Sequence, residues 1–376
     1  MATPARVSKG LDDVVIGRSS ISWVGGETGD LLYRGFDVRD IVPGVPYESV
    51  VHLLLYGEPP RADPSAEVGR ELEARRSVPP AVERVVDALP PGLPPLDALR
   101  TILSALGTGE YGYPPTREQG FDLIARTPVL LARYVRRSRG AAPVPPRADL
   151  GHAANYLWML LGATPEPRRV AALEGYLALL ADHGMNASTF ALRIAISTQS
   201  DLVSAATAAL GTLKGPLHGG APSRVSDMLD AIVSPDRAEA WIADRLARKE
   251  VLYGFGHRAY KTDDPRGIVL HGIAQGIADP HRLALAEAVE RTALESLRRA
   301  KPEARLFTNV EYYSAVVLEA VGLPRAMFTP TFAVARTAGW SAHALEQAAD
   351  NRLIRPDVEY VGPPKGRVWP RPLPGR

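Results

Sequence analysis

The segment KGPLHGGAPSRVSDMLDAI, residues 214–232, carries the first side chain suited to chemistry, His218, which lies between a proline and two glycines. Pro222 suits the first turn of a helix, so we expect His218 to lie near a helix N-terminus. The positive end of the helix dipole disfavours imidazolium there and predicts a neutral ring that can donate one hydrogen bond. The alternative is a loop histidine that only caps the helix.

A second segment, VLYGFGHRAYKTDDPRG at residues 251–267, predicts a site for an anionic ligand. Gly254 and Gly256 permit a close approach of the backbone. Hydrogen-bonding and cationic side chains follow at once, at His257, Arg258, Lys261 and Arg266. GFG lacks the third glycine and the preceding strand of a dinucleotide-binding fingerprint. The alternative is a solvated turn in which TDDPR starts a helix.

The segment LFTNVEYYSAVVLEAVGLP, residues 306–324, offers an acidic group at the start of a predicted helix. Asn309 suits the N-cap and Glu311 the first turn. An acidic residue in that turn is favoured by the helix dipole alone, which is one explanation of it. The other explanation is a general base at the mouth of a cleft.

Arg336 lies among apolar residues of the predicted helix MFTPTFAVARTAGWSAHALEQ, residues 327–347. A buried guanidinium requires an anionic or hydrogen-bonding partner, which is either an internal carboxylate or a substrate carboxylate. His343 follows on the same helix, and we expect it to serve packing or an interface rather than the site.

His183 lies in a break between two predicted helices, in ADHGMNASTFALRI at residues 181–194, where Asn186 suits an N-cap. Helix punctuation alone explains most of this segment. A metal centre formed by His183, His218 and His257 is the alternative, but no two of them have the i, i+4 spacing of ligands on one helix. We therefore expect no metal.

The elements that must position these side chains are almost all helical. Apolar residues recur every three or four positions in residues 65–76, 168–182, 237–250 and 283–300. The run SISWVGGETGDLLYRG predicts one short N-terminal β-hairpin. Proline-rich stretches at 79–95, 141–147 and 361–376 argue against continuous helix, and we expect the last to be a tail along the surface. The predicted class is all-α.

The composition excludes several classes of function. Lys and Arg number 44 against 42 Asp and Glu, so the net charge of +2 is too small to indicate nucleic-acid binding. The chain has no cysteine, which excludes disulfides and thiolate metal sites. We find neither a signal peptide in the first 30 residues nor an apolar run long enough to span a membrane, and expect a cytoplasmic protein.

Seven segments resemble the citrate synthase family, in the same order and at near-identical separations. They are SISWVGGETGDLLYRG, DHGMNASTF, GPLHGG, GFGHRAYKTDDPRG, NVEYYS, RTAGW and RPDVEYVG. The resemblance runs from about residue 10 to residue 362. HGMNAST, HGGAPSRV and NVE are similar to the short bacterial members often called citrate synthase 2.

The resemblance implies an all-α homodimer whose subunits each have two domains. Residues 1–218 and 317–376 would form a large, dimer-forming helical domain, and residues 219–316 a small helical domain that closes over the active site. The implied reaction condenses acetyl-CoA with oxaloacetate and water to give citrate and CoA. Acetyl-CoA and CoA are then substrate and product, with no tightly bound cofactor and no nucleic-acid or membrane partner.

The resemblance also implies roles for single residues. Glu311 would take a proton from the acetyl methyl group, His218 would hold the enolate oxygen, and His257 would stabilise the oxyanion formed on oxaloacetate. Oxaloacetate would be bound by His183, His257, Arg266, Arg336 and, from the neighbouring subunit, Arg355. The CoA side of the site would be lined by Gly254, Phe255, Gly256, Lys261 and Asn309.

Three residues depart from the commoner family pattern: Glu311 stands in place of Asp, Pro222 in place of Asn, and Asp357 in place of Arg. The extra methylene of Glu311 bears directly on the rate. Two alternatives stay open. One is a 2-methylcitrate synthase that uses propionyl-CoA, since one extra methyl group changes binding by only about 1–3 kcal/mol. The other is a non-catalytic homologue that binds a dicarboxylate or CoA.

Overall fold

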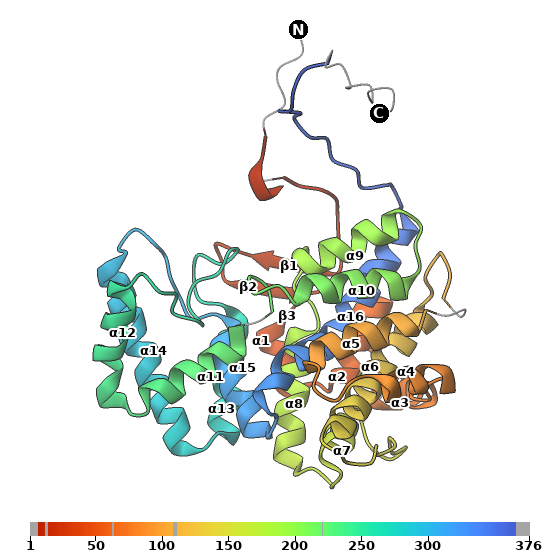
Figure 1. Cartoon of the computed structure of the whole chain (residues 1–376), viewed down its shortest axis with the longest axis horizontal. Coiled ribbons are helices and arrows are strands. Elements are labelled where there is room, and N and C mark those ends of the chain that lie inside the picture. The colour runs from red at the N-terminus through yellow and green to blue at the C-terminus, as the bar shows by residue number, and fades with distance from the viewer. Residues whose placement is uncertain (1–6, 12–13, 62–63, 108–110, 220, 366–376) are drawn as a thin grey trace, which may run out of the picture.

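A computed structural model describes residues 7–11, 14–61, 64–107, 111–219 and 221–365. Across these residues the chain is mostly helical, which confirms the predicted all-α class with its short N-terminal hairpin. Figure 1 shows a larger and a smaller group of helices side by side. No helix within these ranges combines the length and the apolar character that a membrane crossing needs.

The expected hairpin is present near the N-terminus. Strand β1 (Ser22–Gly25) pairs antiparallel with β2 (Asp30–Tyr33). A third strand, β3 (Phe36–Asp37), which the sequence pattern does not predict, extends the sheet in the order β1-β2-β3. Two residues are too few to show the alternation by which a strand is recognised in a sequence.

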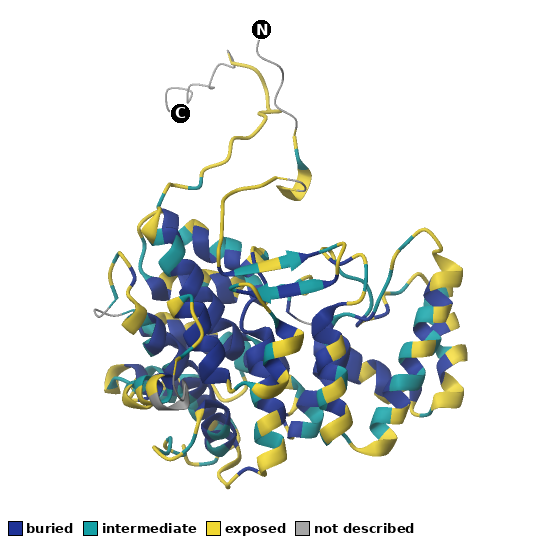
Figure 2. Cartoon of the chain, turned by 180° about the vertical axis from the view of Figure 1, so that it is seen from behind, coloured by how far each residue is buried: buried dark blue, intermediate teal, exposed yellow. Residues whose placement is uncertain are grey.

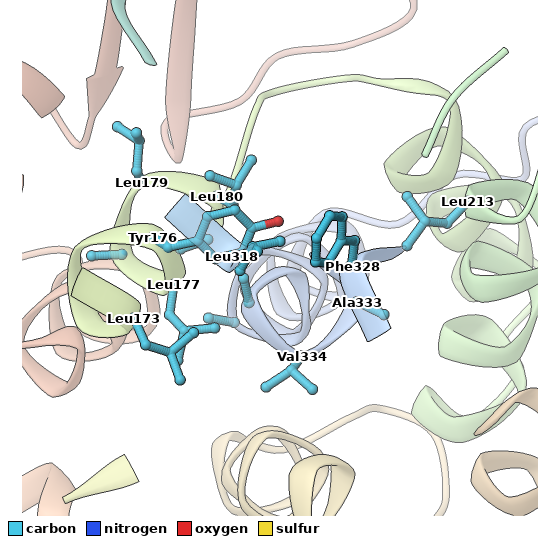
Figure 3. Close-up of a cluster of buried hydrophobic side chains, with 14 of the residues drawn as sticks. Leu173, Tyr176, Leu177, Leu179, Leu180, Leu213, Leu318, Phe328, Ala333 and Val334 are labelled. Carbon is cyan, nitrogen blue, oxygen red and sulfur yellow. The ribbon is translucent and has the colours of Figure 1, made fainter. Parts of the chain in front are cut away.

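The larger group of helices packs around α16 (Phe328–Ala349) and α8 (Pro167–Leu180). Figure 3 shows Leu173 and Leu177 of α8 and Phe328 and Val334 of α16 as members of one cluster of buried apolar side chains. The other helices of this group are α1 (Val38–Ile41), α2 (Tyr47–Tyr56), α3 (Pro64–Arg75), α4 (Pro80–Ala88), α5 (Pro95–Ala105), α6 (Arg117–Ser138), α7 (His152–Leu161), α9 (Ala187–Ser197) and α10 (Leu202–Leu213).

In Figure 2 the buried residues run through the middle of this group, and exposed residues lie on its outer helices and on both terminal segments. The apolar side chains of α16 point in several directions, as expected for a helix that its neighbours surround. The helix that carries Arg336 is therefore fixed on all sides.

The smaller group lies on the left of Figure 1. It consists of α11 (Ala221–Ile232), α12 (Ala238–Ala247), α13 (Pro265–Ile277), α14 (Pro280–Ala300) and α15 (Val310–Val321). Helices α13 and α15 contact each other and also α8, and a short 3-10 turn (Arg325–Met327) leads from α15 towards α16. The division into domains of residues 219–316 and of 1–218 with 317–376 stays a prediction.

The four segments with helical periodicity correspond to α3, α8, α12 and α14, which confirms those predictions. Residues 141–147 contain no helix, as expected. Residues 79–95 hold no continuous helix, as expected, because α4 ends at Ala88 and α5 begins at Pro95, but the nine-residue helix α4 within them was not predicted. Pro79 and Pro80 stand at its N-cap and first helical position, where no backbone N–H has a partner within the helix.

The C-terminal tail also differs from the expectation. Residues 355–365 are exposed and, in Figure 1, extend away from the helical body at the same end as the N-terminal segment. The prediction that the tail follows the surface is therefore wrong for residues 361–365. Residues 366–376, the rest of that stretch, lie outside the described residues.

Gly339 makes a very close contact between α16 and the segment that follows α8. Its backbone N–H donates to the carbonyl of Ala181 at 3.0 Å. A Cβ added to Gly339 would lie 2.4 Å from that carbonyl oxygen and 2.4 Å from Oδ1 of Asp182. Since both neighbours are fully buried, no larger side chain fits here without a shift of the backbone.

Gly339→Ala is therefore expected to lower the free energy of unfolding by about 1–3 kcal/mol, through overpacking. Urea unfolding followed by circular dichroism measures this. Gly272→Ala, on α13, is the matched control, because its added Cβ would meet nothing within 4 Å. The control should raise the free energy of unfolding by up to about 1 kcal/mol. A Gly339→Ala protein as stable as the wild type would contradict the close contact.

Candidate active site

Two histidines from distant segments, His183 and His257, meet beside Tyr260. The rings of His183 and His257 stand edge to face with their centroids 5.4 Å apart, and Nε2 of His183 lies 3.1 Å from the Tyr260 hydroxyl. Burial, together with the positive charge of Arg266, lowers the pKa of His183 well below its ordinary value and that of His257 to about 4. Both rings are therefore neutral at pH 7.

Arg266 lies beside these rings in a buried ion pair with Asp264. Nε of Arg266 donates to Oδ1 at 3.0 Å and Nη2 donates to Oδ2 at 2.7 Å. The same carboxylate caps α13 by accepting the backbone N–H of Arg266 at 3.0 Å, and it accepts the N–H of Val310 at 3.1 Å. One side chain thus joins the starts of α13 and α15 to the guanidinium.

Two hydrogen-bond donors, one from His257 and one from Arg266, face each other. Nδ1 of His257 accepts the backbone N–H groups of Ala259 and Tyr260, at 3.0 and 3.1 Å. The proton of the neutral ring is then on Nε2, which lies 3.3 Å from Nη2 of Arg266. A guanidinium has donors only, so these two groups cannot satisfy each other. A ligand oxygen beside them would accept from both.

The loop of residues 254–256 is tied to the start of α15 through Asn309. Nδ2 of Asn309 donates to the carbonyl of Gly256 at 2.8 Å, and its backbone N–H donates to the carbonyl of Gly254 at 2.9 Å. Oδ1 of Asn309 accepts the N–H of Glu311 at 3.0 Å, which confirms the predicted N-cap. This loop and the first turn of α15 therefore form one unit.

The same loop packs closely on α15. Phe255 pairs with Thr308 in an isolated antiparallel bridge, and its ring lies 5.2 Å from that of Tyr312. Gly254 has φ of +89°, and an added Cβ would lie 2.6 Å from the Tyr312 ring. Only glycine combines this backbone conformation with this approach.

Glu311 occupies the first turn of α15, as predicted. Its side chain is partly buried, and within the described part of the chain its carboxylate has no hydrogen-bond or ion-pair partner. Burial raises its pKa to about 7, although Arg266 acts in the opposite direction. A carboxylate with a pKa near 7 and no partner has the properties of a general base at neutral pH.

His218 lies in the turn between α10 and α11, as predicted. Its Nε2 accepts the backbone N–H of Ser188 at 3.3 Å and lies 2.8 Å from the hydroxyl oxygen of Ser188, whose own proton goes to Asn186. Nε2 therefore accepts, and the neutral ring carries its proton on Nδ1. Burial, with a further effect of Arg336, lowers the pKa of His218 to about 4. The ring is neutral as expected, but burial rather than the helix dipole is the main cause.

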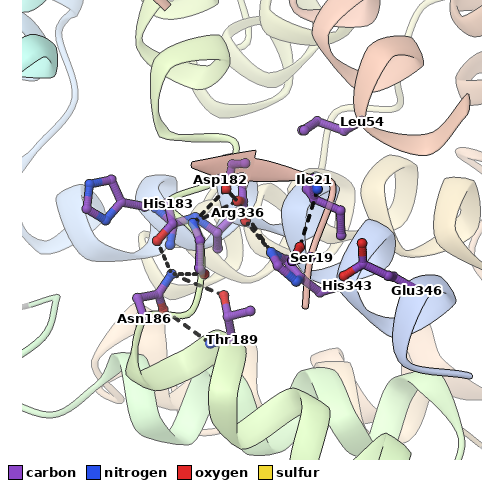
Figure 4. A network of polar contacts seen from close by, with 12 residues as sticks. Ser19, Ile21, Leu54, Asp182, His183, Asn186, Thr189, Arg336, His343 and Glu346 are labelled. Atoms are coloured by element: carbon purple, nitrogen blue, oxygen red, sulfur yellow. Dashed lines mark hydrogen bonds and ion pairs between the residues drawn. The ribbon is translucent and has the colours of Figure 1, made fainter. Parts of the chain in front are cut away.

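Arg336 is only 1% exposed, in the middle of α16. Its Nε donates to the carbonyl of Leu180 at 2.9 Å, and the guanidinium lies 4.8 Å from the centre of the Phe332 ring. Its buried Nη2 has no hydrogen-bond partner among the residues that the structure describes. Figure 4 shows Arg336 next to Asp182 and His183. An unpaired donor in the interior is costly, so this group suits a ligand carboxylate.

Two of the predicted site residues lie apart from this cluster in the single chain. Arg355 follows α16, is exposed, and forms an ion pair with Asp357 at 3.6 Å. Lys261 donates its backbone N–H to the carbonyl of Gly26 at 2.8 Å, while its side chain is exposed. Their roles towards a neighbouring subunit and towards CoA stay predictions.

Sequence reasoning missed three residues that support the site: Asp182, Tyr260 and Asp264. Asp264 had a visible signal, because TDDPR predicts a helix cap. Tyr260 contacts His183, 77 positions away, and Asp182 contacts His343, 161 positions away, so no local pattern indicates either. In the described ranges no three His, Asp or Glu side chains are arranged to hold a metal ion.

Comparison with known proteins gives matches over nearly the whole chain. The family model "Citrate synthase, C-terminal domain" matches residues 10–357. Citrate synthase from Deinococcus radiodurans is 38% identical, over 95% of this chain and 96% of that protein. Citrate synthase 2 from Bacillus subtilis is 38% identical, over 96% and 98%. The 2-methylcitrate synthase 2 of Corynebacterium glutamicum is also 38% identical, over 98% of each chain.

Solved structures agree with these relatives. The crystal structure of citrate synthase from Thermotoga maritima has a TM-score of 0.88 and 37% identity, over 97% of this chain and 98% of that one. A ternary complex of citrate synthase from Thermoplasma acidophilum with carboxymethyl coenzyme A and oxaloacetate has a TM-score of 0.88 and 30% identity, over 97% and 98%. By sequence and by fold over nearly its full length, the chain belongs to the citrate synthase family.

Proposed function

We propose that this chain condenses acetyl-CoA with oxaloacetate and water to give citrate and CoA. Membership of the citrate synthase family supports this, as does the complex of a relative with a CoA analogue and oxaloacetate. The observation that carries the proposal is the carboxylate of Glu311, a base with a raised pKa and no hydrogen-bond or ion-pair partner in the described structure. It shares the site with the donors of His257 and Arg266, which are available to a ligand. A protein that only bound these ligands would need no base.

Oxaloacetate carries two carboxylates and a keto group, and the site offers donors to each. The guanidinium groups of Arg266 and Arg336 would attract the dianion, with the unpaired Nη2 of Arg336 donating to a carboxylate. His183 would add a hydrogen bond, and Arg355 of a second subunit would add a third positive charge. Because His183 is neutral, it can serve without a counter-ion of its own.

Enolisation of acetyl-CoA would follow from the placement of Glu311 and His218. Glu311 removes a proton from the methyl group, and the electron pair of that C–H bond moves to form the enolate. The Nδ1–H group of His218 donates a hydrogen bond to the thioester oxygen on which negative charge develops. A ring that is already neutral does this without gaining or losing a proton.

Condensation would use the paired donors of His257 and Arg266. The enolate carbon attacks the keto carbon of oxaloacetate, and the keto oxygen becomes an alkoxide that accepts from Nε2 of His257 and Nη2 of Arg266. The alkoxide then takes up a proton from water while Glu311 returns the methyl proton to solvent, so that the base is ionised again. Water attacks the thioester carbon of citryl-CoA, the C–S bond breaks, and citrate and CoA are released. No tightly bound cofactor is needed for any of these steps.

The CoA side of the site is assigned to the loop tied to α15, with Gly254, Phe255, Gly256 and Asn309 lining it and Lys261 contacting a phosphate. Backbone groups of this loop are held by the bonds of Asn309 to both glycines. A fixed, glycine-containing backbone allows a large ligand to approach closely.

Residues 219–316 would close as a small domain over the rest of the chain. They carry His257, Arg266 and Glu311, whereas the remaining residues carry His183 and Arg336. Closure would therefore bring the base to the bound oxaloacetate and exclude water until condensation is complete.

The quaternary proposal is a homodimer, acting in the cytoplasm and in the tricarboxylic acid cycle. Apolar side chains are exposed on and around α9 and in the segment after α16, among them Met185, Ile194 and Leu353. A second subunit would cover such a surface. Arg355 is two residues after Leu353, so it would lie at the same subunit contact and could extend into the neighbouring site.

Thiol release tests the proposed function directly. The purified protein is expected to release free CoA when oxaloacetate and acetyl-CoA are both present, and not when either is omitted. Propionyl-CoA tests the 2-methylcitrate alternative, which the relative from Corynebacterium glutamicum motivates. Faster release from propionyl-CoA than from acetyl-CoA would favour that alternative. No release from either would favour a non-catalytic binding protein.

Glu311→Gln is expected to lower kcat by about 10²- to 10⁴-fold, because the amide cannot accept the methyl proton. Glu311→Asp should lower it by about 10²-fold, because the carboxylate is withdrawn by about 1 Å. Thermal unfolding is the control and should change little, since the carboxylate has no partner in the described structure. Full activity of the Gln variant would remove Glu311 from this role.

The pH dependence of the wild-type activity is a second test of Glu311 as the base. Glu311 must be ionised to act as a base, and burial raises its pKa to about 7. Activity should therefore fall as the pH drops below about 7. His218 and His257, with pKa values of about 4, stay neutral between pH 5 and 8 and should cause no further change of activity in that range.

Mixing two inactive variants tests the contribution of Arg355 across the dimer. Arg355→Ala and Glu311→Gln are each expected to be nearly inactive. After equal amounts are unfolded and refolded together, about a quarter of the wild-type activity should return, because half the dimers are mixed and each has one intact site. If activity stays at the level of the parents, Arg355 does not act in the neighbouring site.

A further inference from the structure

Asp182 is a fully buried carboxylate that the proposed chemistry does not use. It accepts the backbone N–H of Gly184 at 2.8 Å and the hydroxyl of Ser22 on β1. Nε2 of His343, on α16, lies 3.3 Å from Oδ1 and 3.4 Å from Oδ2. Asp182 therefore joins the sheet, the segment that carries His183, and the helix that carries Arg336.

His343 has its tautomer fixed by a second contact. Its Nδ1 lies 2.8 Å from Nη1 of Arg193, and because a guanidinium only donates, Nδ1 must accept. The ring proton is therefore on Nε2 and points at Asp182. Arg193 is itself held by Glu346 at 2.8 Å and by Oε1 of Gln347 at 3.0 Å. The donor that His343 presents to Asp182 is thus oriented by Arg193, which is held by partners of its own.

The negative charge of Asp182 lies close to Arg336 without forming an ion pair with it. Burial would raise the pKa of Asp182, but His343 and Arg336 together lower it to about 2, so it is ionised. The close contact of Gly339 with Asp182 and Ala181 sets the distance between the two segments. The guanidinium is partly neutralised in this way, while its Nη2 is left for a ligand.

We infer that Asp182, oriented by His343, is a positioning residue for the binding of oxaloacetate. It fixes the positions of His183 and Arg336, which lie on two separate segments, relative to each other. It also places a negative charge beside Arg336 without accepting a hydrogen bond from the Nη2 group of that residue. It contacts neither the acyl-CoA side of the site nor Glu311. This inference rests on the proposed function, since it assigns oxaloacetate as the ligand of His183 and Arg336.

Asp182→Asn tests the inference with almost no change in volume. Three groups donate to Oδ2, and Nε2 of His343 also lies 3.3 Å from Oδ1, which has no hydrogen bond in the described structure. The amide nitrogen of Asn therefore faces the Nε2–H group of His343 in either position, so the segment of His183 should shift. We expect the KM and the Kd for oxaloacetate to rise about tenfold or more, and the KM for acetyl-CoA to stay within about twofold. Calorimetric titration with oxaloacetate gives the Kd without turnover, and steady-state kinetics gives both KM values.

Ser341→Ala is the matched control, because Ser341 is buried on the same helix and its hydroxyl donates only to the carbonyl of Thr337. It should change neither KM. Ser22→Ala is a milder variant in case Asp182→Asn fails to fold. It removes one hydroxyl from Asp182 and should raise the Kd for oxaloacetate about two- to fivefold.

The results separate this inference from the proposed function. A wild-type protein that binds oxaloacetate and releases thiol, with folded variants whose Kd is unchanged, would overturn the inference alone. Equal rises in both KM values would also overturn it, because they would indicate a general disturbance. A wild-type protein that does not bind oxaloacetate would overturn both. A rise confined to oxaloacetate supports the positioning role.

Discussion

Asp264 and Arg266 form a charged pair in the interior, and the arrangement of the whole site depends on it. The carboxylate binds the guanidinium through two hydrogen bonds, caps α13 and accepts from the first residue of α15. Its removal would leave a positive charge buried without a partner, which is strongly destabilising. Removal of the carboxylate would also break the link between the start of α13, which carries Arg266, and the start of α15, which carries Glu311.

The electrostatics of the site follow mainly from its burial. Burial, with a further effect of the buried cations Arg266 and Arg336, keeps the nearby histidines neutral. His218 and His257 are therefore hydrogen-bond donors of fixed tautomer, and none of the three histidines is a competing cation. The same burial acts on Glu311 in the opposite sense and raises its pKa to about 7. One apolar enclosure thus produces both a usable base and neutral donors.

Much of the local structure of the site could be predicted from the sequence, because the residues that begin and end a helix lie within a few positions of one another. The cap at Asn309, the break around His183 and the turn before α11 are each encoded within a few residues. The partners of Asp182 and Tyr260 could not be predicted, since they are set by how distant segments pack. Helix α4 was missed because prolines were taken as breaks where they begin a helix.

The hydrogen bonds of Asn309 to Gly254 and Gly256 limit how the site can change by substitution. Because they join the loop before His257 to the turn of Glu311, neither segment can shift without the other. A lineage that exchanged the longer acid for a shorter one would need a compensating change in the glycine loop. Residues 254–257 and 309–311 are therefore one structural unit, and a change in either segment acts on the position of the other.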